Sequence, residues 1–352
     1  MEKILTIAIP TYNRRNQLIR LLKSIESQNC IGVYSILISD NCSSYSVQDA
    51  LDEEFLGEFR DNIEVMRREV NGGGDYNISS IFAYAKTKLF WIVGDDDELT
   101  PGSISKVIEK SEKYPDIPVF KYRMPAAFDF PEDIRLSCVD DLVNCHKKGF
   151  LLGGIIFVSN NVYNTALAKP FFSDCLYYGY CSVSQLIPMA HCLVDSDFDA
   201  LLCKDIIVKY NAPEGDHWNY NKIVTSLASL LDINWGSNHK EIRKFFKVIT
   251  YPFGIGEFLI ENLKIKDKSY RKYIYWKGIH TVFKRRKGFW DIIALSFYWL
   301  ERITCIPFLS RVYVGLLNKQ TEIQNKFREK AKTNATAAKW FYFLKKHITL
   351  MR

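Results

Sequence analysis

The stretch from Leu89 to Pro101 constrains the fold of this chain more than any other feature. It begins with an apolar run, Leu89 to Val93, whose length and content of β-branched and aromatic residues are typical of a buried strand. The run stops at Gly94, and three consecutive carboxylates, Asp95 to Asp97, follow it. Pro101 then favours the start of a helix, because proline suits a first helical turn. The acids are therefore expected on a tight turn at the C-terminal end of a strand, the edge at which open α/β sheets bind ligands.

Three adjacent aspartates repel one another and need a compensating partner. Two unit charges about 5 Å apart repel by roughly 3 kcal/mol at an effective dielectric constant near 20. Solvent, raised pKa values or a bound cation could each offset this repulsion. Aspartate oxygens suit Mg²⁺ or Mn²⁺, and Mg²⁺ is usually held by one or two carboxylates together with substrate phosphates. A solvated acidic turn is the alternative interpretation, but the buried strand before the triplet and the segments upstream of it favour the cation.

Length and composition fit one large domain with an extension. The chain has 352 residues, of which 47% are hydrophobic, enough for the core of a domain of about 200–250 residues plus a further segment. Its nine cysteines include no CxxC pair and no regular framework, which favours reduced thiols and a cytosolic protein. Because the N-terminus leads directly into a strand pattern, we expect no signal peptide.

Charge is divided unevenly along the chain. Residues 240–352 contain 25 Lys and Arg against 8 Asp and Glu, whereas residues 1–239 contain 22 against 32. An acidic N-terminal part and a basic C-terminal part indicate two regions with different functions. We therefore expect a catalytic domain over residues 1–238 and a basic, mainly α-helical extension over residues 239–352.

Strand and helix patterns alternate along the first part of the chain. Apolar runs predict strands at residues 4–9, 35–39, 63–67, 89–93, 117–123, 153–158 and 201–208. Helical patterns are found at residues 18–25, 47–59 and 77–86. This alternation predicts an α/β fold with a parallel sheet and right-handed crossovers.

Polar residues follow three of these strands at the same edge of the predicted sheet. They are the segments Thr11 to Arg15, Asp40 to Ser44 and Asp95 to Asp97. Each segment alone is ordinary turn chemistry. Parallel strands bring all three together, and this convergence favours a binding site.

The same segments resemble a known family. Ile-Pro-Thr-Tyr-Asn-Arg, Ile-Ser-Asp-Asn, Asn71-x-Gly73 and Gly-Asp-Asp-Asp-x-Leu-x-Pro occur in the order and spacing of the inverting family 2 glycosyltransferases, over roughly residues 3–125. The resemblance implies a GT-A fold, a Rossmann-like arrangement with a mostly parallel central sheet flanked by helices. It looks closest to the bacterial sugar transferases of O-antigen and capsule assembly, including abequosyltransferase-like members. The chain has no Gly-x-Gly-x-x-Gly pattern, so a dinucleotide-binding fold has little support.

The resemblance also implies roles for individual residues. The residues expected to bind the nucleotide-sugar donor are Pro10, Thr11, Tyr12, Arg14, Asp40, Asn71, Gly73, Asp95 and Asp96. Asp40 would accept a hydrogen bond from the base of the donor. The Asp-x-Asp spacing of Asp95 and Asp97 implies a Mg²⁺ or Mn²⁺ ion on the diphosphate. An alignment anchored on Pro101 instead gives Asp96 the metal-facing place, so Asp96 and Asp97 are both candidate metal ligands.

The implied reaction needs a general base. Charge that builds on the leaving phosphate would be stabilised by the cation, while the attacking acceptor hydroxyl must lose a proton. Many family 2 enzymes use the Asp of a Glu-Asp pair before the next helix, but residues 172–181 contain no such pair. Asp174 is the nearest carboxylate and the first candidate for the base. His191 falls in an apolar stretch and is expected to be a core histidine.

A polar, glycine-containing loop at residues 211–218 supplies two reserve candidates for the base or for contact with phosphate, Asp216 and His217. Such a loop suits sugar binding or a lid over the donor. The alternative is a plain surface loop in which Trp218 packs inward.

The basic extension mixes aromatic with basic side chains. Lysines and arginines alternate with Tyr270, Tyr273 and Trp276, and charges and Pro307 interrupt the apolar stretch 292–317, so we predict no transmembrane helix. This composition favours contact with an anionic membrane surface, which implies a cytoplasmic protein that is peripheral at the inner face of the cytoplasmic membrane. Helices packed on the catalytic domain with a solvated basic face are the alternative, and nucleic-acid binding is disfavoured.

Together these observations predict a metal-dependent, inverting glycosyltransferase that acts in bacterial surface polysaccharide synthesis. It would move a sugar from a nucleotide-sugar donor to a glycan or lipid-linked oligosaccharide acceptor. One rival is an α/β enzyme that transfers nucleotidyl or phosphoryl groups with the same acids. The other is a non-catalytic, transferase-like membrane assembly factor, which the missing Glu-Asp pair keeps open.

Overall fold

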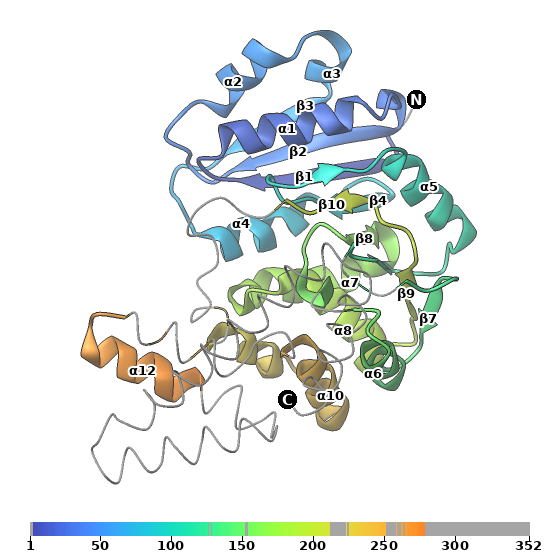
Figure 1. Ribbon diagram of the computed structural model, residues 1–352, viewed down its shortest axis with the longest axis vertical. Helices are drawn as coiled ribbons and strands as arrows, with labels where there is room; N and C mark the ends of the chain where they lie inside the picture. Colours follow the sequence, from blue (N-terminus) through green and yellow to red (C-terminus); the bar gives the residue numbers. More distant parts are fainter. Residues whose placement is uncertain are drawn as a thin grey trace, which may run out of the picture. The chain divides into compact units, whose positions relative to one another are not determined.

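A computed structural model of the chain describes residues 3–125, 127, 129–151, 154–211, 223, 225–250, 258, 262 and 265–278 (Figure 1). The chain divides into two compact units, one formed by residues 1–217 and 229–252 and the other by residues 218–228 and 253–352. The first unit contains the sheet and its polar edge, and α12 (Lys268–Gly278) belongs to the second.

The central sheet of the first unit has eight strands in the order β3-β2-β1-β4-β8-β6-β9-β7. Their bounds are β1 (Leu5–Thr11), β2 (Tyr34–Asp40), β3 (Ile63–Arg67), β4 (Leu89–Ile92), β6 (Val119–Tyr122), β7 (Ile134–Leu136), β8 (Asn161–Asn164) and β9 (Ala200–Cys203). A separate antiparallel pair joins β5 (Glu98–Leu99) to β10 (Val208–Lys209).

Strand direction divides the sheet into two halves. β3, β2, β1 and β4 are parallel neighbours. β8 runs antiparallel to both β4 and β6, β9 is parallel to β6, and β7 is antiparallel to β9. All strands except β8 and β7 therefore point in one direction, which confirms the mostly parallel sheet that the sequence predicts.

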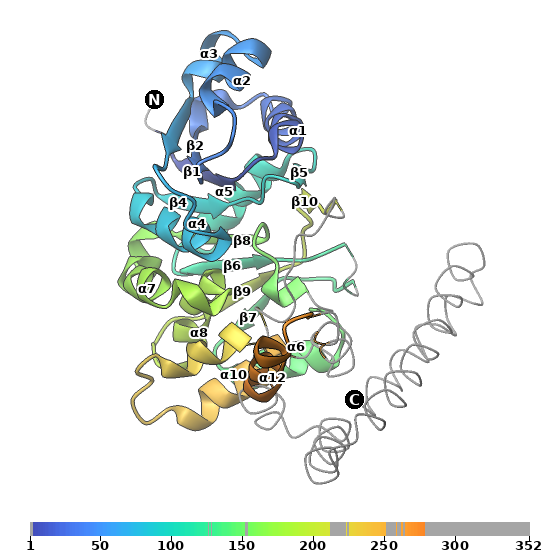
Figure 2. The same ribbon diagram turned by 90° about the vertical axis from the view of Figure 1, so that its left-hand side faces the viewer.

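Helices cover both faces of the sheet (Figure 2). The α-helices of the first unit are α1 (Arg15–Glu26), α2 (Val47–Glu54), α3 (Gly57–Asp61), α4 (Gly74–Ser80), α5 (Ser103–Lys113), α6 (Val139–Lys147), α7 (Thr165–Tyr177), α8 (Ile187–Val194) and α10 (His239–Thr250). The 3₁₀-helices are η1 (Ile31–Val33), η2 (Ile81–Tyr84), η3 (Gly154–Ile156), η4 (Gly179–Cys181), η5 (Ser184–Leu186) and η6 (Leu227–Asp232), the last of which crosses from the second unit into the first.

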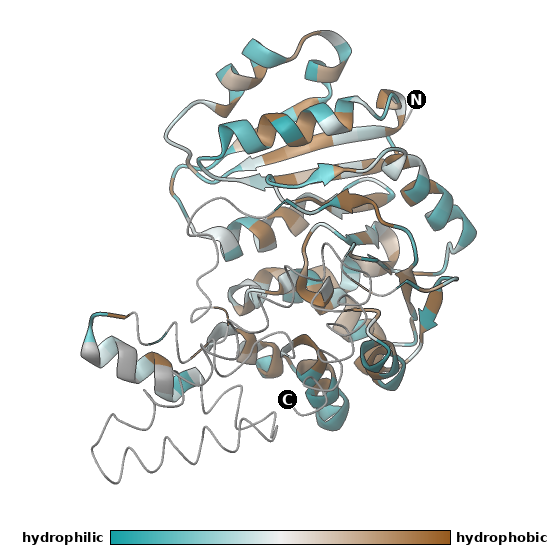
Figure 3. Ribbon diagram, in the orientation of Figure 1, coloured by the Kyte–Doolittle hydropathy of each residue, from teal (hydrophilic) through white to brown (hydrophobic). Residues whose placement is uncertain are grey.

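Alternate side chains of the strands pack into two apolar layers, one on each face of the sheet. On one face, Trp91 and Val93 join an apolar cluster with residues of α1, α2, α3 and α5. On the other face, the ring of Phe90 lies 5.9 Å from that of Phe82 and 6.3 Å from that of Phe172 on α7. This alternation explains the continuous apolar run in the sequence, because strands covered on both faces have no polar side. Figure 3 shows the contrast between the apolar strands and the hydrophilic outer face of α1.

Three predicted elements differ from the structure. The strand predicted at residues 201–208 is interrupted, because β9 covers Ala200–Cys203 and β10 covers Val208–Lys209. Residues 47–59 form two helices, α2 and α3, because the backbone of Phe55 adopts an extended conformation that ends the first helix. The strand predicted at residues 153–158 is wrong: η3 occupies part of that segment, and the strand is β8, at Asn161–Asn164. The side-chain amide of Asn161 donates to the carbonyls of Phe157 and Val158, and that of Asn160 donates to the carbonyls of Tyr122 and Gly154. These bonds hold residues 157–160 in a turn.

Helix α10 follows residue 238 and lies within the first compact unit. Helix α10 buries Ile242, Phe245 and Phe246, and Lys244 is 2.9 Å from Asp140 at the start of α6. Helix α10 is thus part of this unit. Among the described residues, no helix is both long and apolar enough to cross a membrane.

Candidate active site

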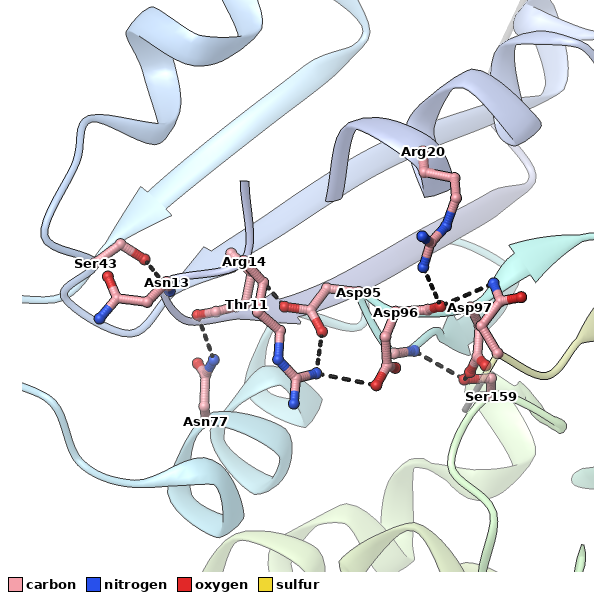
Figure 4. Close-up of polar contacts among 12 residues, drawn as sticks. Thr11, Asn13, Arg14, Arg20, Ser43, Asn77, Asp95, Asp96, Asp97 and Ser159 are labelled. Carbon is pink, nitrogen blue, oxygen red and sulfur yellow. Dashed lines mark hydrogen bonds and ion pairs between the residues drawn. The ribbon is translucent and has the colours of Figure 1, made fainter. Parts of the chain in front are cut away.

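One edge of the sheet collects the polar residues that the sequence singled out. Thr11 and Asp40 are paired at the ends of β1 and β2, and the acidic turn follows β4 at the same edge. Because β8 runs in the opposite direction, its N-terminal end, rather than its C-terminal end, meets this edge. Ser159 therefore arrives beside the acidic turn (Figure 4).

Asp95 is locked into the sheet by residues of the β1 loop. Its Oδ2 accepts a hydrogen bond from Thr11 Oγ1 at 2.8 Å, and its Oδ1 lies 2.7 Å from Arg14 Nη1. Burial raises the pKa of the Asp95 carboxyl to about 6, although Arg14 and Thr11 act in the opposite direction. Both oxygens of Asp95 are thus occupied by the protein.

Asp96 is the most accessible of the three acids. Its side chain is 24% exposed and its Oδ2 lies 3.1 Å from the same Arg14 nitrogen, which bridges the two carboxylates. The pKa of the Arg14 guanidinium is raised above its ordinary value, because the charges and hydrogen bonds of Asp95 and Asp96 outweigh a burial that alone would lower it. The Asp96 carbonyl accepts hydrogen bonds from Arg20 and Asn211.

Asp97 is held from the opposite side, by Ser159. The Ser159 hydroxyl donates to Asp97 Oδ2 at 2.5 Å and accepts from the Gly94 amide at 2.8 Å. Asp97 is 2% exposed, and burial raises the pKa of its carboxyl to about 7. Within the described part of the chain, its Oδ1 is buried and accepts no hydrogen bond. One oxygen of Asp97 is therefore buried without a hydrogen-bond partner among the described residues, and the nearby backbone amide of Asn211 partly offsets the rise in the pKa of this carboxyl.

A buried lysine fixes the turn that carries Ser159. Lys121 Nζ donates to the Phe157 carbonyl at 3.1 Å and to the side-chain oxygens of Asn160 and Asn161 at 2.5 and 3.2 Å. Burial lowers the pKa of Lys121 well below its ordinary value. Trp91 adds a 2.7 Å hydrogen bond from its indole nitrogen to the Ser159 carbonyl.

The loops after β2 and β3 form the other side of the edge. Asp40 is fully buried, and its carboxylate accepts hydrogen bonds from the Ser43 amide at 2.9 Å and from Arg67 Nη1 at 2.8 Å. Asn71 Oδ1 accepts from Asn41 at 2.7 Å and from the Gly73 amide at 2.8 Å. The chain turns here through Gly73, whose φ of +86° favours glycine.

Pro10 and Tyr12 lie at the end of β1, and the Tyr12 side chain is 42% exposed. Every expected donor-binding residue is therefore at this edge. The sequence analysis missed Asn77 in α4, whose side-chain amide donates to the carbonyls of Ser39 and Thr11 at 3.0 and 3.4 Å. Ser159, next to the strand predicted at residues 153–158, was also not among the predicted site residues.

The described residues contain no group of three or more His, Cys, Asp or Glu side chains arranged to hold a metal ion. Asp96 and the open oxygen of Asp97 nevertheless suit a cation of the Mg²⁺ type, since such ions are held by one or two carboxylates and complete their coordination with water and phosphate. Asp95 is less suited, because Thr11 and Arg14 use both its oxygens.

The first candidate base, Asp174, lies on α7. Its Oδ2 is 3.0 Å from His191 Nε2, and the other ring nitrogen of His191 is 2.9 Å from Asp195. The Asp174 side chain is 32% exposed. His191 is buried between the rings of Phe171 and Trp235, as expected of a core histidine. The reserve candidates, Asp216 and His217, lie outside the described residues.

Comparison with known proteins agrees with this geometry. Residues 6–135 match the model of glycosyl transferase family 2. Abequosyltransferase RfbV of Salmonella typhimurium is 33% identical over 103 residues, which cover 29% of this chain and 31% of that protein. The match thus spans about a third of the length of that relative.

Two solved structures have a similar fold. Staphylococcus aureus TarS 1-349, in complex with UDP-GlcNAc, matches with a TM-score of 0.57 at 14% identity, over 81% of this chain and 80% of the other. The mannosyltransferase PcManGT from Pyrobaculum calidifontis, in complex with GDP-Man and Mn²⁺, matches with a TM-score of 0.50 at 11% identity, over 90% and 84%. At these identities the likeness concerns the GT-A fold alone.

Proposed function

We propose that the chain transfers a sugar from a nucleotide-sugar donor to a glycan acceptor, and the match of residues 6–135 to the model of glycosyl transferase family 2 supports this proposal. The observation that carries the proposal is the acidic turn. Asp97 keeps one buried oxygen without a hydrogen bond, next to the loops of Asp40 and Asn71 at the same edge. A site with one open carboxylate oxygen beside polar loops suits a nucleoside diphosphate brought with a cation.

In this proposal the donor lies along the edge, with its base toward Asp40 and its diphosphate toward the acidic turn. Asp40 is bonded to Ser43 and Arg67, and the Asn41–Asn71 pair lies at the same edge. Arg67, Asn41 and Asn71 are therefore further candidates for contact with the base of the donor. The complexes of TarS with UDP-GlcNAc and of PcManGT with GDP-Man support a nucleotide-sugar as the donor class.

Asp96 and Asp97 would hold a Mg²⁺ or Mn²⁺ ion, which supplies a Lewis acid for the charge on the departing diphosphate. Arg14 keeps Asp95 and Asp96 together and neutralises part of their repulsion before the donor arrives. Ser159 bonds one oxygen of Asp97, and the second oxygen has no hydrogen-bond partner among the described residues.

The acceptor hydroxyl would attack opposite the leaving group, so that the anomeric centre is inverted. Asp174 is the proposed base within the described residues, and Asp216 is the reserve. His191 and Asp195 form a chain of hydrogen bonds behind Asp174, which would fix the orientation of its carboxylate and accommodate a proton taken from the acceptor.

We further propose that the acceptor is lipid-linked and that the product is a bacterial surface polysaccharide, for which the partial identity with an abequosyltransferase is the support. The boundary between a catalytic domain and a basic, membrane-associated extension near residue 238 remains part of this proposal. Helix α12 supports the membrane contact, because Tyr270, Tyr273 and Trp276 are each about half exposed in a strongly basic segment.

The experiment that tests the function is an assay of purified protein with a panel of nucleotide-sugars and Mn²⁺, with the released nucleotide identified by chromatography. Release of a nucleoside diphosphate from one donor is expected. Release of a nucleoside monophosphate would point instead to a nucleotidyl- or phosphoryl-transferring enzyme. Tight binding of a donor with no turnover, with or without membrane extracts as a source of acceptor, would favour the non-catalytic assembly factor.

A further inference from the structure

Three tyrosines are clustered at the C-terminal end of α7 and on the turn that follows it. Tyr177 is 77% exposed and Tyr180 is 55% exposed. The ring of Tyr178 lies between them, 5.2 Å from Tyr177 and 6.3 Å from Tyr180. Large aromatic side chains left in water together mark a binding surface more often than isolated ones do.

The backbone of this turn is fixed against α4. Gly179 packs so closely on Ser79 that a Cβ atom there would collide with the serine side chain. Three residues further on, the Ser182 hydroxyl donates to Asp75 at 3.0 Å. Figure 2 shows α4 beside α7, as these contacts require. The backbone of the tyrosine turn therefore has a defined position against α4.

This position is continuous with the proposed donor site. Helix α4 begins at Gly74, directly after Gly73, whose amide bonds Asn71 in the donor loop. Asp75, which holds the tyrosine turn, is in the first turn of α4. The helix has seven residues, and at 1.5 Å per residue it spans only about 10 Å. The distance from the tyrosines to the donor loop is thus about the length of one or two sugar residues.

The proposed base lies on the same side of α7. Asp174 is three residues before Tyr177 and four before Tyr178, and residues at these spacings share one helix face. An acceptor that rests on the tyrosines would therefore have a carboxylate within reach of its hydroxyls.

The chemistry of the cluster matches a sugar ring. A pyranose has an apolar face of C–H groups and a rim of hydroxyls, while a tyrosine has an apolar ring and a polar hydroxyl. The three side chains carry no charge, so they do not select a phosphate. Carbohydrate sites that combine aromatic faces with a few polar groups fit the general composition of ligand pockets.

We propose that Tyr177, Tyr178 and Tyr180 form the acceptor subsite and bind an uncharged sugar ring of the glycan acceptor by stacking. The proposal rests on the proposed function, since an acceptor is needed only if a sugar is transferred. The glycan then lies across the end of α4, with the hydroxyl to be glycosylated between Asp174 and the donor.

The test is saturation-transfer NMR of the whole protein with four probes, the methyl glycosides of galactose, mannose, rhamnose and N-acetylglucosamine. At least one glycoside is expected to receive saturation at its ring protons from the wild-type protein. The signal should fall at least fivefold in a Tyr177→Ala/Tyr180→Ala variant and be retained in the Tyr177→Phe/Tyr180→Phe variant, which keeps the rings. The matched control is Tyr84→Ala, which removes an exposed tyrosine of η2 and should leave the signal unchanged.

Each sample also receives a thermal-shift measurement with nucleoside diphosphates and Mn²⁺, which separates this proposal from the proposed function. Equal stabilisation of all variants by one diphosphate would show that they fold and that the donor site is intact. Under that condition, no signal from any glycoside, or an equal signal in the double alanine variant, would overturn the tyrosine subsite alone. Loss of binding to anionic lipid vesicles in the double alanine variant, with glycoside binding unchanged, would assign the tyrosines to a membrane and overturn it as well. Should the double variant not fold, Tyr177→Ala alone gives the same comparison, since a side chain this exposed tolerates truncation.

Discussion

The two halves of the sheet build their parts of the site in different ways. In the half formed by β3, β2, β1 and β4, polar side chains extend from the ends of parallel strands and bond one another across the edge, as Thr11 bonds Asp95 and Asn41 bonds Asn71. In the half that contains β8, one strand is reversed. There the site residues come from turns, Ser159 before β8 and the tyrosines after α7.

The two halves differ in how firmly their site residues are held. The parallel half is a mutually bonded network, and within the described residues one buried carboxylate oxygen of this network, on Asp97, has no hydrogen-bond partner. The turns of the other half present exposed rings and a carboxylate on α7. We interpret the first half as a rigid donor site and the second as the place where acceptor specificity is set, in keeping with the general role of loops on a rigid scaffold.

The largest expected effect is at Asp97 in the rigid half. Asp97→Asn keeps the shape of the side chain and removes the charge, so transfer should fall about 1000-fold, the range expected when a main electrostatic contribution to the transition state is lost. Nucleoside diphosphate release in the presence of Mn²⁺ measures it. Asp61→Asn, at the exposed end of α3, is the matched control. A loss below tenfold would break the assignment of Asp97.

A smaller loss is expected at Asp174, and it should leave donor binding intact. Asp174→Asn removes the proposed base and should lower kcat about 100-fold, with the affinity for the nucleoside diphosphate unchanged. Steady-state kinetics and diphosphate titration measure the two quantities. An unchanged kcat would remove Asp174 from the reaction and leave Asp216 as the candidate base. A parallel loss of donor affinity would mean that the two halves are not separable.

The buried acids should make stability depend on pH in a particular direction. The pKa of Asp97 is raised to about 7 in the folded protein from 3.8, so between these values the folded state binds more protons and its stability falls as pH rises. Relative to wild type, Asp97→Asn should therefore gain about 2 kcal/mol of unfolding free energy between pH 5 and pH 7. Urea denaturation in EDTA at both pH values measures the gain. An equal difference at the two pH values would contradict the burial of this carboxyl.

The smallest effect is expected where the two halves meet, at Ser159. Ser159→Ala removes the hydrogen bond to Asp97 and the acceptor of the Gly94 amide, at about 1 kcal/mol per neutral hydrogen bond and more for one to a charged group. Affinity for Mn²⁺ in the presence of nucleoside diphosphate should fall about fivefold to tenfold, and Ser159→Thr, which keeps the hydroxyl, should restore most of it. If alanine and threonine weaken Mn²⁺ equally, Ser159 acts only through packing.

Much of the first half could be predicted from the sequence. Parallel βα units place the residues after each strand at one edge, so Thr11, Asp40 and Asp95 could be brought together from strand patterns alone. The apolar run before the acids also predicted a fully covered strand, as Trp91 and Phe90 pack on opposite faces.

The second half could not be predicted in the same way. β8 is a short strand with asparagine at both ends, so its apolar signal is two residues long, and the stronger apolar run at residues 154–158 attracted the prediction instead. The antiparallel direction of β8 brings Ser159 to Asp97. This direction depends on pairing with β4 and β6, which precede β8 by about 70 and about 40 residues in the sequence. Lys121 gave no signal either, since a buried lysine in a strand is rare.

The central claim is that the acidic edge binds a nucleoside diphosphate through a divalent cation. Isothermal titration of the wild-type protein with nucleoside diphosphates, with Mn²⁺ and with EDTA, followed by the same titration of Asp97→Asn, tests it most directly. We predict that one diphosphate binds, that Mn²⁺ strengthens its binding at least tenfold, and that Asp97→Asn loses this gain. Absence of binding by every diphosphate, or a gain from Mn²⁺ that Asp97→Asn retains in full, would contradict the claim.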